Sequence, residues 1–438
     1  MWRRSLLALA LLALSNRPAS SEERAQTIFR NARDYTVRIR TQIVTPFIED
    51  ERGSFEGAGF LVDAARGWVV TNAHVVGQSP STVQVAFADE DMRPARKLYV
   101  DSFTDVAILQ VAMEGHRHRA AAVQCDRLPS IGEAVGVFGH PQGYSFTGTR
   151  GIISGKTDRE IVDLLQTDAT VDHGNSGGPM IALTDGRVVG IASAGYELRK
   201  EDKVNFATPM KDVCRILELL RNGVPAEPPV LEFGLVIDDK GSHTLEVGTT
   251  SDAERWPFLP GDKILSVGRP AEPVRTPHEL VTVLRGRSGV VPIRVRRGGS
   301  EVEIQARPRL RPSVIARRAV VLDGALIAPL MVEDSTALRE PAQLVVHSVE
   351  SGSAAESMQL ESLDVIESVD GRHYGDLDSL IQHLETRAKG APSAWSLADS
   401  ARAGLGGSII TWRSCLATRS RRSAQTRSCP RPIRASDP

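Results

Sequence analysis

Ser176 stands in the stretch "GNSGGP", residues 174–179, where three glycines, an asparagine and a proline flank one hydroxyl. Small neighbours let backbone and substrate come close to a side chain, so this setting favours a nucleophile. Serine attacks only when a base takes its proton, and a histidine does so best beside a carboxylate that fixes its tautomer. His74 in "VVTNAHVV" and Asp105 in "TDVAILQV" are the candidates for these two groups. The alternative is a glycine-rich turn in which the hydroxyl only caps the backbone.

The segment from Phe29 to Ala207 must position these side chains. It contains short β-branched runs, such as "GAGFLVDA" and "RVVGIASAG", separated by glycine and polar turns. Regular short strands with turn signals predict an all-β barrel or sandwich. The chain order His74, Asp105, Ser176 is the order found in the chymotrypsin-like double barrel. A helix in "MKDVCRILELLRNG" is predicted to follow and to end at Gly223.

Two further units follow a proline-bearing linker, "VPAEPP", which ends a first domain placed at residues 25–222. Residues 230–308 carry predicted strands, a helix in "TPHELVTVLRG" and a closing hairpin. Residues 318–390 repeat this unit, because "DKILSV" recurs as "DVIESV" and an amphipathic helix follows each. The closing hairpin has no clear counterpart there, so this unit lacks its final strands or ends in disorder. Residues 391–438, rich in arginine and serine, are predicted to be a disordered tail.

The first 21 residues have the layout of a secretory signal peptide. Arg3 and Arg4 precede a short apolar run, and small residues follow at positions 19–21. The run is shorter than the stretch of about 20 apolar residues that spans a bilayer, so we expect cleavage near Ser21. An uncleaved anchor is the alternative. No later stretch is apolar enough to span a membrane.

Composition limits the partners and the crosslinks. The chain has 53 basic and 54 acidic residues, so nothing in its balance favours nucleic acid or an anionic surface. Its four cysteines show no metal-site spacing and imply no disulfide framework. We therefore expect Cys125 and Cys214 to be buried free thiols.

The motifs "TNAHVV", "TDVAIL", "GNSGGP" and "FATP" occur here in the order and spacing of the HtrA/Deg family of trypsin-like serine endopeptidases, which the chain resembles over most of residues 25–385. The resemblance implies a mainly β fold, in which a chymotrypsin-like double β-barrel precedes two PDZ-like α+β domains. It also implies roles for the three candidate residues. His74 is the general base, Asp105 orients it, and Ser176 is the nucleophile.

The same resemblance implies an oxyanion hole made by backbone N–H groups of Gly174 and Ser176, with Asn175 shaping the turn. Donors of this kind are worth about 3 kcal/mol each. The family commonly has Asn-Pro before this motif, where this chain has Asp172 and His173, so a looser turn is expected. His173 is expected to be solvated, and tuning of activity by pH is the alternative. The other loop histidines are expected to be solvated as well: His116, His118 and His140.

Substrate preference depends on Thr170, which lies six residues before the nucleophile. Trypsin-like enzymes that cut after lysine or arginine carry an aspartate at this place. A cation here would meet no counter-charge, so small or aliphatic residues are expected before the scissile bond. The small residues Ala192, Ser193 and Ala194 suit pairing with an extended substrate backbone, although an ordinary packed strand explains them nearly as well.

The two repeated units suggest capture of chain ends. A PDZ domain binds a C-terminal peptide as an added strand and holds its carboxylate with backbone N–H groups. Phe233, Gly234 and Leu235 in "EFGLVI" match the apolar-glycine-apolar loop that does this. Gly324 in "DGALIA" is a looser match in the last unit, where a spacer or an oligomer contact is the alternative.

The leading hypothesis is an exported, ATP-independent serine endopeptidase that cuts unfolded or damaged proteins and needs no metal, nucleotide or other cofactor. The resemblance implies a periplasmic homotrimer or a higher homo-oligomer that binds C-terminal peptides at its PDZ units. One alternative is a chaperone or binding protein that uses the same barrel and PDZ units without cutting. Another is a processing protease with a single substrate.

Overall fold

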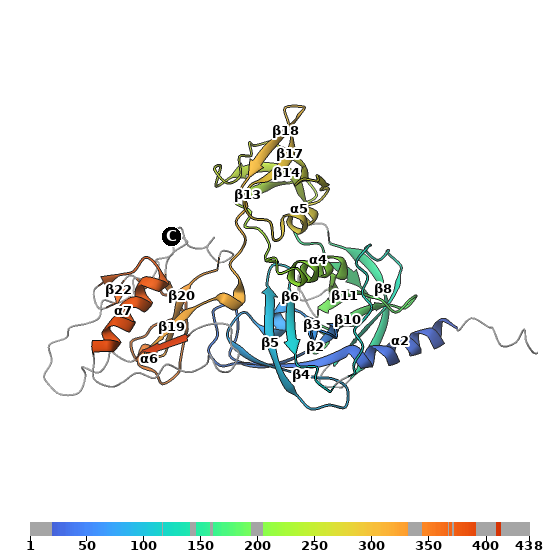
Figure 1. The fold of residues 1–438 in the computed structure, drawn as a ribbon, viewed down its shortest axis with the longest axis horizontal. Helices are drawn as coiled ribbons and strands as arrows, with labels where there is room; N and C mark the ends of the chain where they lie inside the picture. Colours follow the sequence, from blue (N-terminus) through green and yellow to red (C-terminus); the bar gives the residue numbers. More distant parts are fainter. Residues whose placement is uncertain are drawn as a thin grey trace, which may run out of the picture.

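The computed structural model describes residues 20–115, 117–140, 146–157, 161–193, 205–331, 344–366, 368–369, 372–390 and 409–412. Two closed six-stranded barrels form the body, and two further units stand beside it (Figure 1). This mainly β architecture with a chymotrypsin-like double barrel confirms the predicted fold class. Of the signal peptide expected over residues 1–21, residues 1–19 lie outside the described residues. Within the described ranges, no helix has the length and apolar character needed to cross a membrane.

The first barrel forms because its strands alternate apolar and polar side chains, so that one face closes on a core. In its first strand Val37 and Ile39 are fully buried, whereas Arg40 is exposed. The order around the barrel is β1-β2-β3-β6-β5-β4. Its strands are β1 (Thr36–Ile43), β2 (Gly53–Asp63), β3 (Trp68–Thr71), β4 (Ser81–Ala86), β5 (Arg93–Asp101) and β6 (Val106–Val111).

The second barrel is closed in the order β10-β11-β12-β9-β8-β7. Its strands are β7 (Ala134–Gly139), β8 (Thr147–Lys156), β9 (Leu165–Thr167), β10 (Pro179–Ala182), β11 (Val188–Ser193) and β12 (Asn205–Pro209). Every residue of β11 is buried, as expected for a strand covered on both faces. The predicted helix, α4 (Met210–Arg221), supplies part of this cover because it packs on β11 and β12.

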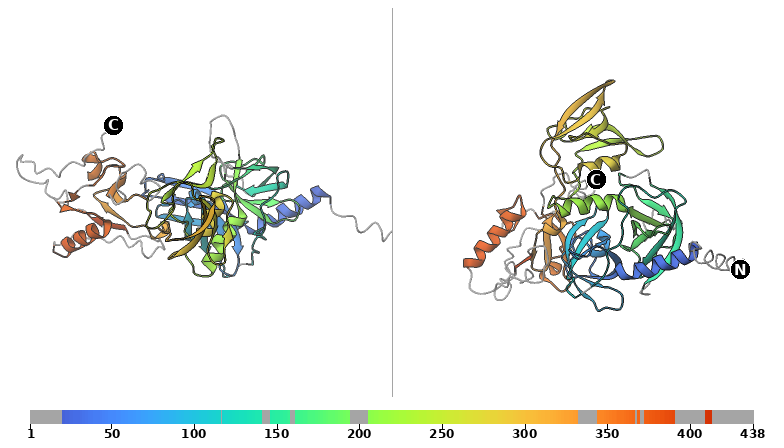
Figure 2. Two further views of the ribbon diagram at one scale, coloured as in Figure 1. Left: turned by 90° about the horizontal axis from the view of Figure 1, so that it is seen from above. Right: turned by 45° about the vertical axis from the view of Figure 1, so that its right-hand side comes forward.

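Helix α2 (Ser21–Tyr35) precedes the first barrel and was not predicted from the sequence. It begins with a capping box, in which Ser20 and Glu23 each satisfy a backbone N–H of the other. Its Phe29 ring stacks on Phe138 of the second barrel, with ring centroids 5.8 Å apart. Gly136 makes room, since a Cβ there would lie 2.5 Å from the Phe29 ring. The helix thus lies along the edge of the two barrels (Figure 2).

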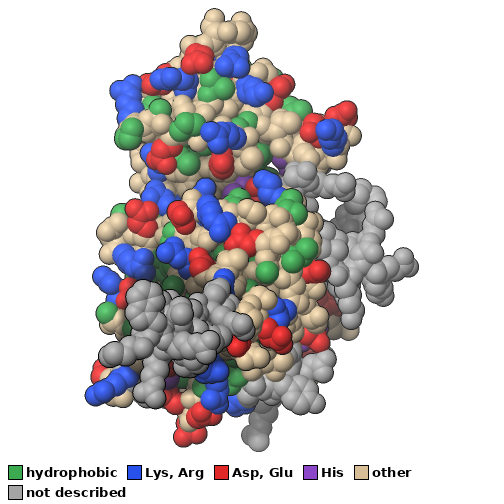
Figure 3. Space-filling view, turned by 90° about the vertical axis from the view of Figure 1, so that its right-hand side faces the viewer, with side chains coloured by type: hydrophobic (Ala, Val, Ile, Leu, Met, Phe, Trp, Pro, Cys, Tyr) green, Lys and Arg blue, Asp and Glu red, His purple; other side chains and the backbone are tan. Residues whose placement is uncertain are grey.

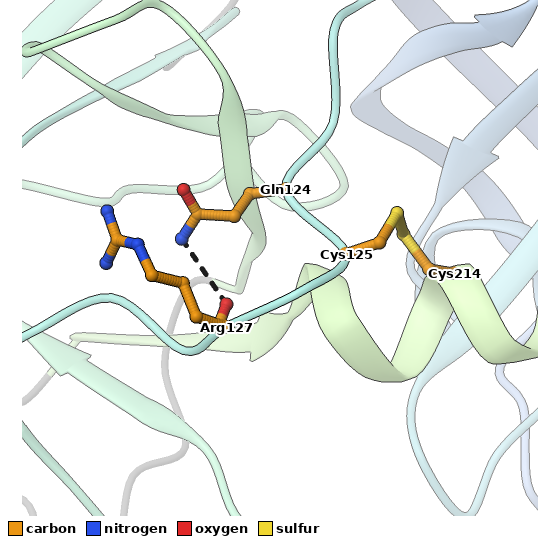
Figure 4. Close-up of a disulfide and its surroundings, with 4 residues drawn as sticks. All are labelled: Gln124, Cys125, Arg127 and Cys214. Atoms are coloured by element: carbon orange, nitrogen blue, oxygen red, sulfur yellow. Dashed lines mark hydrogen bonds between the residues drawn. A yellow bond between two sulfur atoms is a disulfide. The ribbon is translucent and has the colours of Figure 1, made fainter.

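Cys125 and Cys214 are joined by a disulfide, so the expectation of free thiols for this pair is wrong (Figure 4). Their Cα atoms lie 5.7 Å apart, although 89 residues separate them in sequence. Cys125 lies in the segment that connects the barrels, and Cys214 lies on α4. Sequence spacing carries no information about this distance, because only the closed fold brings the connector and the helix together.

The second unit holds the sheet β13-β14-β15-β17-β18, with β16 paired to β15. Its elements are β13 (Phe233–Ile237), β14 (His243–Thr250), β15 (Lys263–Val267), β16 (Glu272–Pro273), α5 (Pro277–Leu284), β17 (Val291–Arg297) and β18 (Ser300–Ala306). The predicted hairpin turns at Gly298 and Gly299, both with positive φ. Strand β14 has no counterpart among the predicted strands. The core includes Trp256 and Phe258.

The third unit has a four-stranded sheet, β21-β20-β19-β24, and a two-stranded one, β22-β23. Its elements are η2 (Val314–Ala316), β19 (Ala319–Leu322), β20 (Ala325–Pro329), β21 (Leu344–Val349), α6 (Ala354–Ser357), β22 (Ser368–Val369), β23 (Arg372–His373), α7 (Leu377–Gly390) and β24 (Ile409–Trp412). Strand β24 pairs in parallel with β19. It lies in the segment expected to be a disordered tail, and the rest of that segment is outside the described residues.

The recurring motif of the two units corresponds to a recurring local geometry. In the second unit the N–H of Val247 donates to the Asp262 carbonyl at 2.9 Å, and in the third the N–H of Val346 donates to the Asp364 carbonyl at 2.9 Å. Each aspartate opens its copy of the motif, and a helix follows each copy. Gly324 differs from Gly234 in its setting, because it lies with Asp323 in the tight turn between β19 and β20.

Removal of the disulfide should destabilise the barrels without unfolding them. A crosslink that closes a loop of 89 residues stabilises by about 4–5 kcal/mol in the chain-entropy model. We expect Cys125→Ser/Cys214→Ser to lower the thermal midpoint by about 10 °C, measured by circular dichroism. Cys415→Ser/Cys429→Ser is the control. Alkylation of Cys125 and Cys214 in unreduced, unfolded wild type, read by mass spectrometry, would contradict the crosslink.

Candidate active site

His74 and Asp105 form a hydrogen-bonded pair where β3 leads into the one-turn helix α3 (Ala73–Val76). Nδ1 of His74 lies 2.9 Å from Oδ2 and 3.1 Å from Oδ1 of Asp105. The backbone N–H of His74 donates to Oδ1 of the same carboxylate at 3.0 Å. Asn72 completes the arrangement by donating its Nδ2 to the Asp105 carbonyl at 2.9 Å. The carboxylate therefore keeps the proton on Nδ1, which leaves Nε2 able to accept one.

The electrostatics of the pair suit a base. Burial lowers the pKa of His74, but the hydrogen bond and the charge of Asp105 outweigh burial and hold this pKa above its usual value. The side chain of His74 is still 47% exposed, because it faces a hollow in the surface. A histidine with a raised pKa is a stronger base once it has lost its proton.

The turn that carries Asp105 is fixed by a second carboxylate, that of Asp101. Oδ1 of Asp101 accepts the backbone N–H groups of Phe103 and Thr104, at 3.0 Å and 3.3 Å. Oδ2 accepts the Thr104 hydroxyl at 2.6 Å and Arg285 Nη1, from the second unit, at 2.7 Å. Asp105 itself has φ of +53°, a conformation that non-glycine residues adopt only where the surroundings enforce it.

The serine loop lies at the seam between the barrels. The Ser176 carbonyl accepts the N–H of Ala58 in β2 at 2.8 Å. Gly177 is needed here, because its φ is +85° and a Cβ would lie 2.1 Å from the Ala58 carbonyl oxygen and 2.2 Å from the Thr71 hydroxyl. Thr71 ends the strand that leads to His74. The loop is thus held against the segment that carries the histidine.

Gly57 of β2 shows how closely α3, which carries His74, approaches the serine loop. A Cβ on Gly57 would lie 2.7 Å from a methyl carbon of Val75, which follows His74 on α3. The same Cβ would lie 3.1 Å from the Ser176 carbonyl oxygen. Val75, next to His74, and the carbonyl of Ser176 therefore both lie against Gly57 at the seam between the barrels.

Hydrogen bonds shape the turn before Ser176. Gly174 has φ of +96°, and its carbonyl accepts the N–H of His140 at 3.2 Å. The N–H of Asn175 donates to the Asp172 carbonyl at 2.9 Å, and the N–H of His173 donates to the Asp172 carboxylate at 2.7 Å. These bonds supply part of the restraint that a proline would give by its fixed φ. His173 is exposed, as expected.

His140 is not solvated, contrary to the sequence-based expectation. It is buried beside the serine loop, and burial lowers its pKa to about 4, so it is neutral at pH 7. Its Nδ1 accepts the N–H of Phe146 at 3.2 Å. His118 is also mostly covered, because its ring stacks on Phe87 with centroids 3.9 Å apart. His116 lies outside the described residues.

A hollow of about 430 Å³ opens beside His74 and Asp105. Part of its wall is the connection between β1 and β2, which contributes Glu49, Asp50 and Glu51. Ser193, at the end of β11, lines the hollow from the second barrel. The cavity therefore lies between the two barrels on the side of the histidine. Within the described ranges, no cluster of three or more histidine, cysteine or acidic residues could hold a metal ion.

The residues proposed for substrate binding have different settings. Thr170 is exposed, and its carbonyl accepts the Thr149 hydroxyl at 2.8 Å. Ala192 needs a correction, because its N–H donates to the Gly178 carbonyl at 2.8 Å and its carbonyl accepts the N–H of Gly177 at 2.8 Å. It braces the serine loop and has no N–H left for a substrate. Ser193 lines the hollow, and Ala194 lies outside the described residues.

The proposed carboxylate-binding residues of the second unit lie within a strand. Phe233, Gly234 and Leu235 begin β13, which pairs with β14 and forms one edge of the sheet. The Phe233 ring packs edge-on against Trp256 and Phe258, with centroids 4.9 Å apart in both cases. The outer edge of β13 has the backbone geometry that an added strand requires.

Lys97 is a positioning residue that sequence reasoning missed. Its Nζ donates to the carbonyls of Val76, Gly77 and Ser79, at 3.0, 2.9 and 2.7 Å. It thereby closes the carboxyl end of α3 and fixes the chain just after His74. Burial lowers its pKa to about 8. No sequence signal identifies it, because "RPARKLYVD" reads as an ordinary strand with exposed basic residues.

Comparisons with known proteins agree with this geometry. The trypsin-like peptidase domain family matches residues 57–191. The serine protease Do-like HtrA of Bacillus subtilis is 29% identical over 289 residues, 58% of this chain and 63% of that protein. The probable periplasmic serine endoprotease DegP-like of Chlamydia pneumoniae is 26% identical over 356 residues, 75% of this chain and 71% of that protein.

Solved structures give the same fold. The structure of the HtrA-type protease AlgW with a decapeptide has a TM-score of 0.51 at 22% identity, and the match covers 66% of this chain and 99% of that one. The chain spans less than two thirds of the Bacillus relative, at 63% of its length. The double barrel thus contains a trypsin-like peptidase domain over residues 57–191, and the chain is similar to serine proteases of the HtrA/Deg type.

Proposed function

We propose that this protein is a serine endopeptidase that hydrolyses peptide bonds through an acyl-enzyme on Ser176. The observation that carries the proposal is the His74–Asp105 pair, whose Nδ1 and Oδ2 atoms lie 2.9 Å apart beside the hollow. The serine loop lies against the segment that leads to His74. His74 and Asp105 have the mutual geometry of a base and its orienting residue.

The proposed reaction assigns one role to each group. His74 Nε2 takes the proton of the Ser176 hydroxyl while Oγ attacks the substrate carbonyl carbon. The backbone N–H groups of Gly174 and Ser176 stabilise the negative oxygen of the tetrahedral intermediate. His74 then gives its proton to the leaving amine, and a water molecule, activated in the same way, releases the acid and restores the serine. The Asp105 carboxylate stabilises the imidazolium that forms.

We propose that the enzyme works outside the cytoplasm, on unfolded or damaged proteins, as a homotrimer or a larger homo-oligomer. The Cys125–Cys214 disulfide supports export, because such crosslinks persist in oxidising compartments. The name of the Chlamydia relative includes the word periplasmic. The open edge of β13 supports binding of extended C-terminal peptides in the second unit.

The charge pattern of the surface supports protein substrates over nucleic acid. On the face drawn in Figure 3, lysine and arginine side chains are interspersed with aspartate and glutamate over the barrels and the second unit. The sequence as a whole is near neutral, with a formal net charge of -1. Nucleic-acid binding relies on a concentrated positive surface.

A fluorophosphonate probe tests the nucleophile directly. We expect it to modify wild type at Ser176, because the proposed mechanism gives this serine a base and two amide donors. Ser176→Ala should abolish labelling, and His74→Ala should reduce it by at least about a hundredfold. Intact-mass spectrometry gives the readout. Absence of labelling in a folded wild type that still binds unfolded casein would favour a chaperone instead.

The pH profile tests the base. His74 must be neutral to accept a proton, and its pKa lies above the usual value, so kcat/KM should rise through a midpoint above about pH 6.5. Asp105→Asn removes the interaction that raises this pKa, so the midpoint should move to lower pH while kcat falls by a factor on the order of 10⁴. Stopped assays on a fluorogenic peptide give both values. An unchanged midpoint in Asp105→Asn would contradict the assignment.

Peptide series test the preference for the residue before the scissile bond. Thr170 carries no charge to pair with a cation, so peptides with valine or alanine there should exceed the arginine peptide in kcat/KM by about tenfold or more. Thr170→Asp should shift the ratio toward arginine, and Thr184→Asp, at an exposed turn position between β10 and β11, is the control. Strong cleavage of the arginine peptide by wild type would show that another residue sets the preference.

A further inference from the structure

The connection between β1 and β2, residues 44–52, is embedded in the third unit; we call it the acidic loop. Phe47 at its centre is fully buried, and it forms a small core with Ala319, Leu326 and Ala328 of the third unit. These partners lie about 270 residues or more further along the chain. Figure 1 shows β19 and β20 beside the first barrel, where this contact is made. The first barrel and the third unit therefore share a hydrophobic core at this loop.

Polar contacts surround this core. Arg317 Nη1 donates to both carboxylate oxygens of Glu49, at 2.9 Å and 3.0 Å. Its guanidinium carbon lies 3.9 Å from the centroid of the Phe47 ring. The N–H of Ile48 donates to His347 Nδ1 at 3.2 Å. One loop thus receives a charge pair, a cation–π contact and a backbone bond from the third unit.

Burial makes these contacts costly to break. The side chains of Arg317 and Glu49 are only 5% and 11% exposed. Removal of one partner of a buried pair leaves the other charge uncompensated, which is strongly destabilising. Burial and the charge of Arg317 lower the pKa of His347 to about 4, so at pH 7 its Nδ1 can accept the Ile48 N–H. The protonation state and the hydrogen bond therefore agree.

The acidic loop also forms hydrogen bonds with Ser79, which lies just after α3, the helix that carries His74. The N–H of Phe47 donates to the Ser79 hydroxyl at 2.7 Å, and the N–H of Ser79 donates to the Asp50 carboxylate at 2.6 Å. Lys97 joins the Ser79 carbonyl to the end of α3, which carries His74. On its other side the loop places Glu49, Asp50 and Glu51 in the wall of the hollow.

We propose that Arg317 and His347 are positioning residues of the catalytic site, through which the third unit holds the acidic loop as one wall of the substrate hollow. The inference rests on the proposed endopeptidase function. Release of the loop moves the wall and three carboxylates, so it weakens substrate binding. The His74–Asp105 pair keeps its own bonds, so the chemical step at Ser176 is retained.

The test compares Arg317→Met with Arg318→Met in the full-length protein. Methionine keeps an unbranched apolar side chain but removes the guanidinium, and with it the pair with Glu49 and the cation–π contact with Phe47. Arg318 is the neighbouring arginine, and it pairs with Asp378, whose side chain is 76% exposed, within the third unit itself. We expect Arg317→Met to raise KM for a fluorogenic peptide at least fivefold, with kcat and the rate of fluorophosphonate labelling within twofold of wild type. Arg318→Met should leave all three unchanged.

Two further measurements separate positioning from a general loss of stability. Hydrogen exchange at pH 7 should show loss of protection in residues 46–50 of Arg317→Met and not of Arg318→Met. Glu49→Gln should also raise KM, and Glu49→Gln/Arg317→Met should be no worse than Arg317→Met alone, because both changes remove the same ion pair.

The two possible failures are distinguishable. If wild type is neither labelled at Ser176 nor active, the proposed function is overturned. If wild type is labelled and active but Arg317→Met matches Arg318→Met in KM and in exchange, the positioning inference alone is overturned. A fall in kcat and in labelling rate at unchanged KM also overturns it, because that pattern places the effect in the chemical step.

Discussion

The turn that carries Asp105 depends on one constraint, the buried carboxylate of Asp101. Its side chain is 2% exposed, and that of its partner Arg285 is 3% exposed. Such a charge is tolerated in an interior only when its oxygens are satisfied. The satisfying groups come from the turn that ends in Asp105 and from the second unit. The position of Asp105 therefore depends on the docking of the second unit. The candidate site is thus not formed by the barrels alone.

The two repeated units share a local geometry but attach differently. The second unit meets the barrels through Arg285 and through His278, whose Nε2 lies 2.9 Å from the Asp212 carboxylate on α4. The third unit attaches through Arg317 and His347 at the connection between β1 and β2. The second unit therefore contacts the turn that leads to Asp105. The third unit contacts the acidic loop, which lines the hollow beside His74. The shared local geometry therefore does not determine where each unit docks, which depends on its own surface residues.

The fold class and the three candidate catalytic residues could be predicted from local sequence patterns. Alternation in β1 and the glycines around Ser176 act over a few residues, so their meaning survives without a structure. The Cys125–Cys214 pair, Lys97 and Arg285 could not be predicted, because each acquires its role from residues that are distant in sequence. Helix α2 was not predicted because "SEERAQTIFRNARDY" is mostly polar and only four of its residues are buried. The burial of His140 is also a tertiary effect, since β1 of the first barrel and the serine loop of the second both lie against it.

The disulfide has a mechanical consequence. It fastens α4, the last element before the linker to the second unit, to the segment that joins the two barrels. A pull on the second unit would reach α4 at Arg221, and unwinding of the helix from that end would stop at Cys214, where the crosslink takes the load. The tension would be carried by the middle of the protease body. Force transmitted through the linker therefore leaves the first part of α4, from Met210 to Cys214, fastened to the barrels.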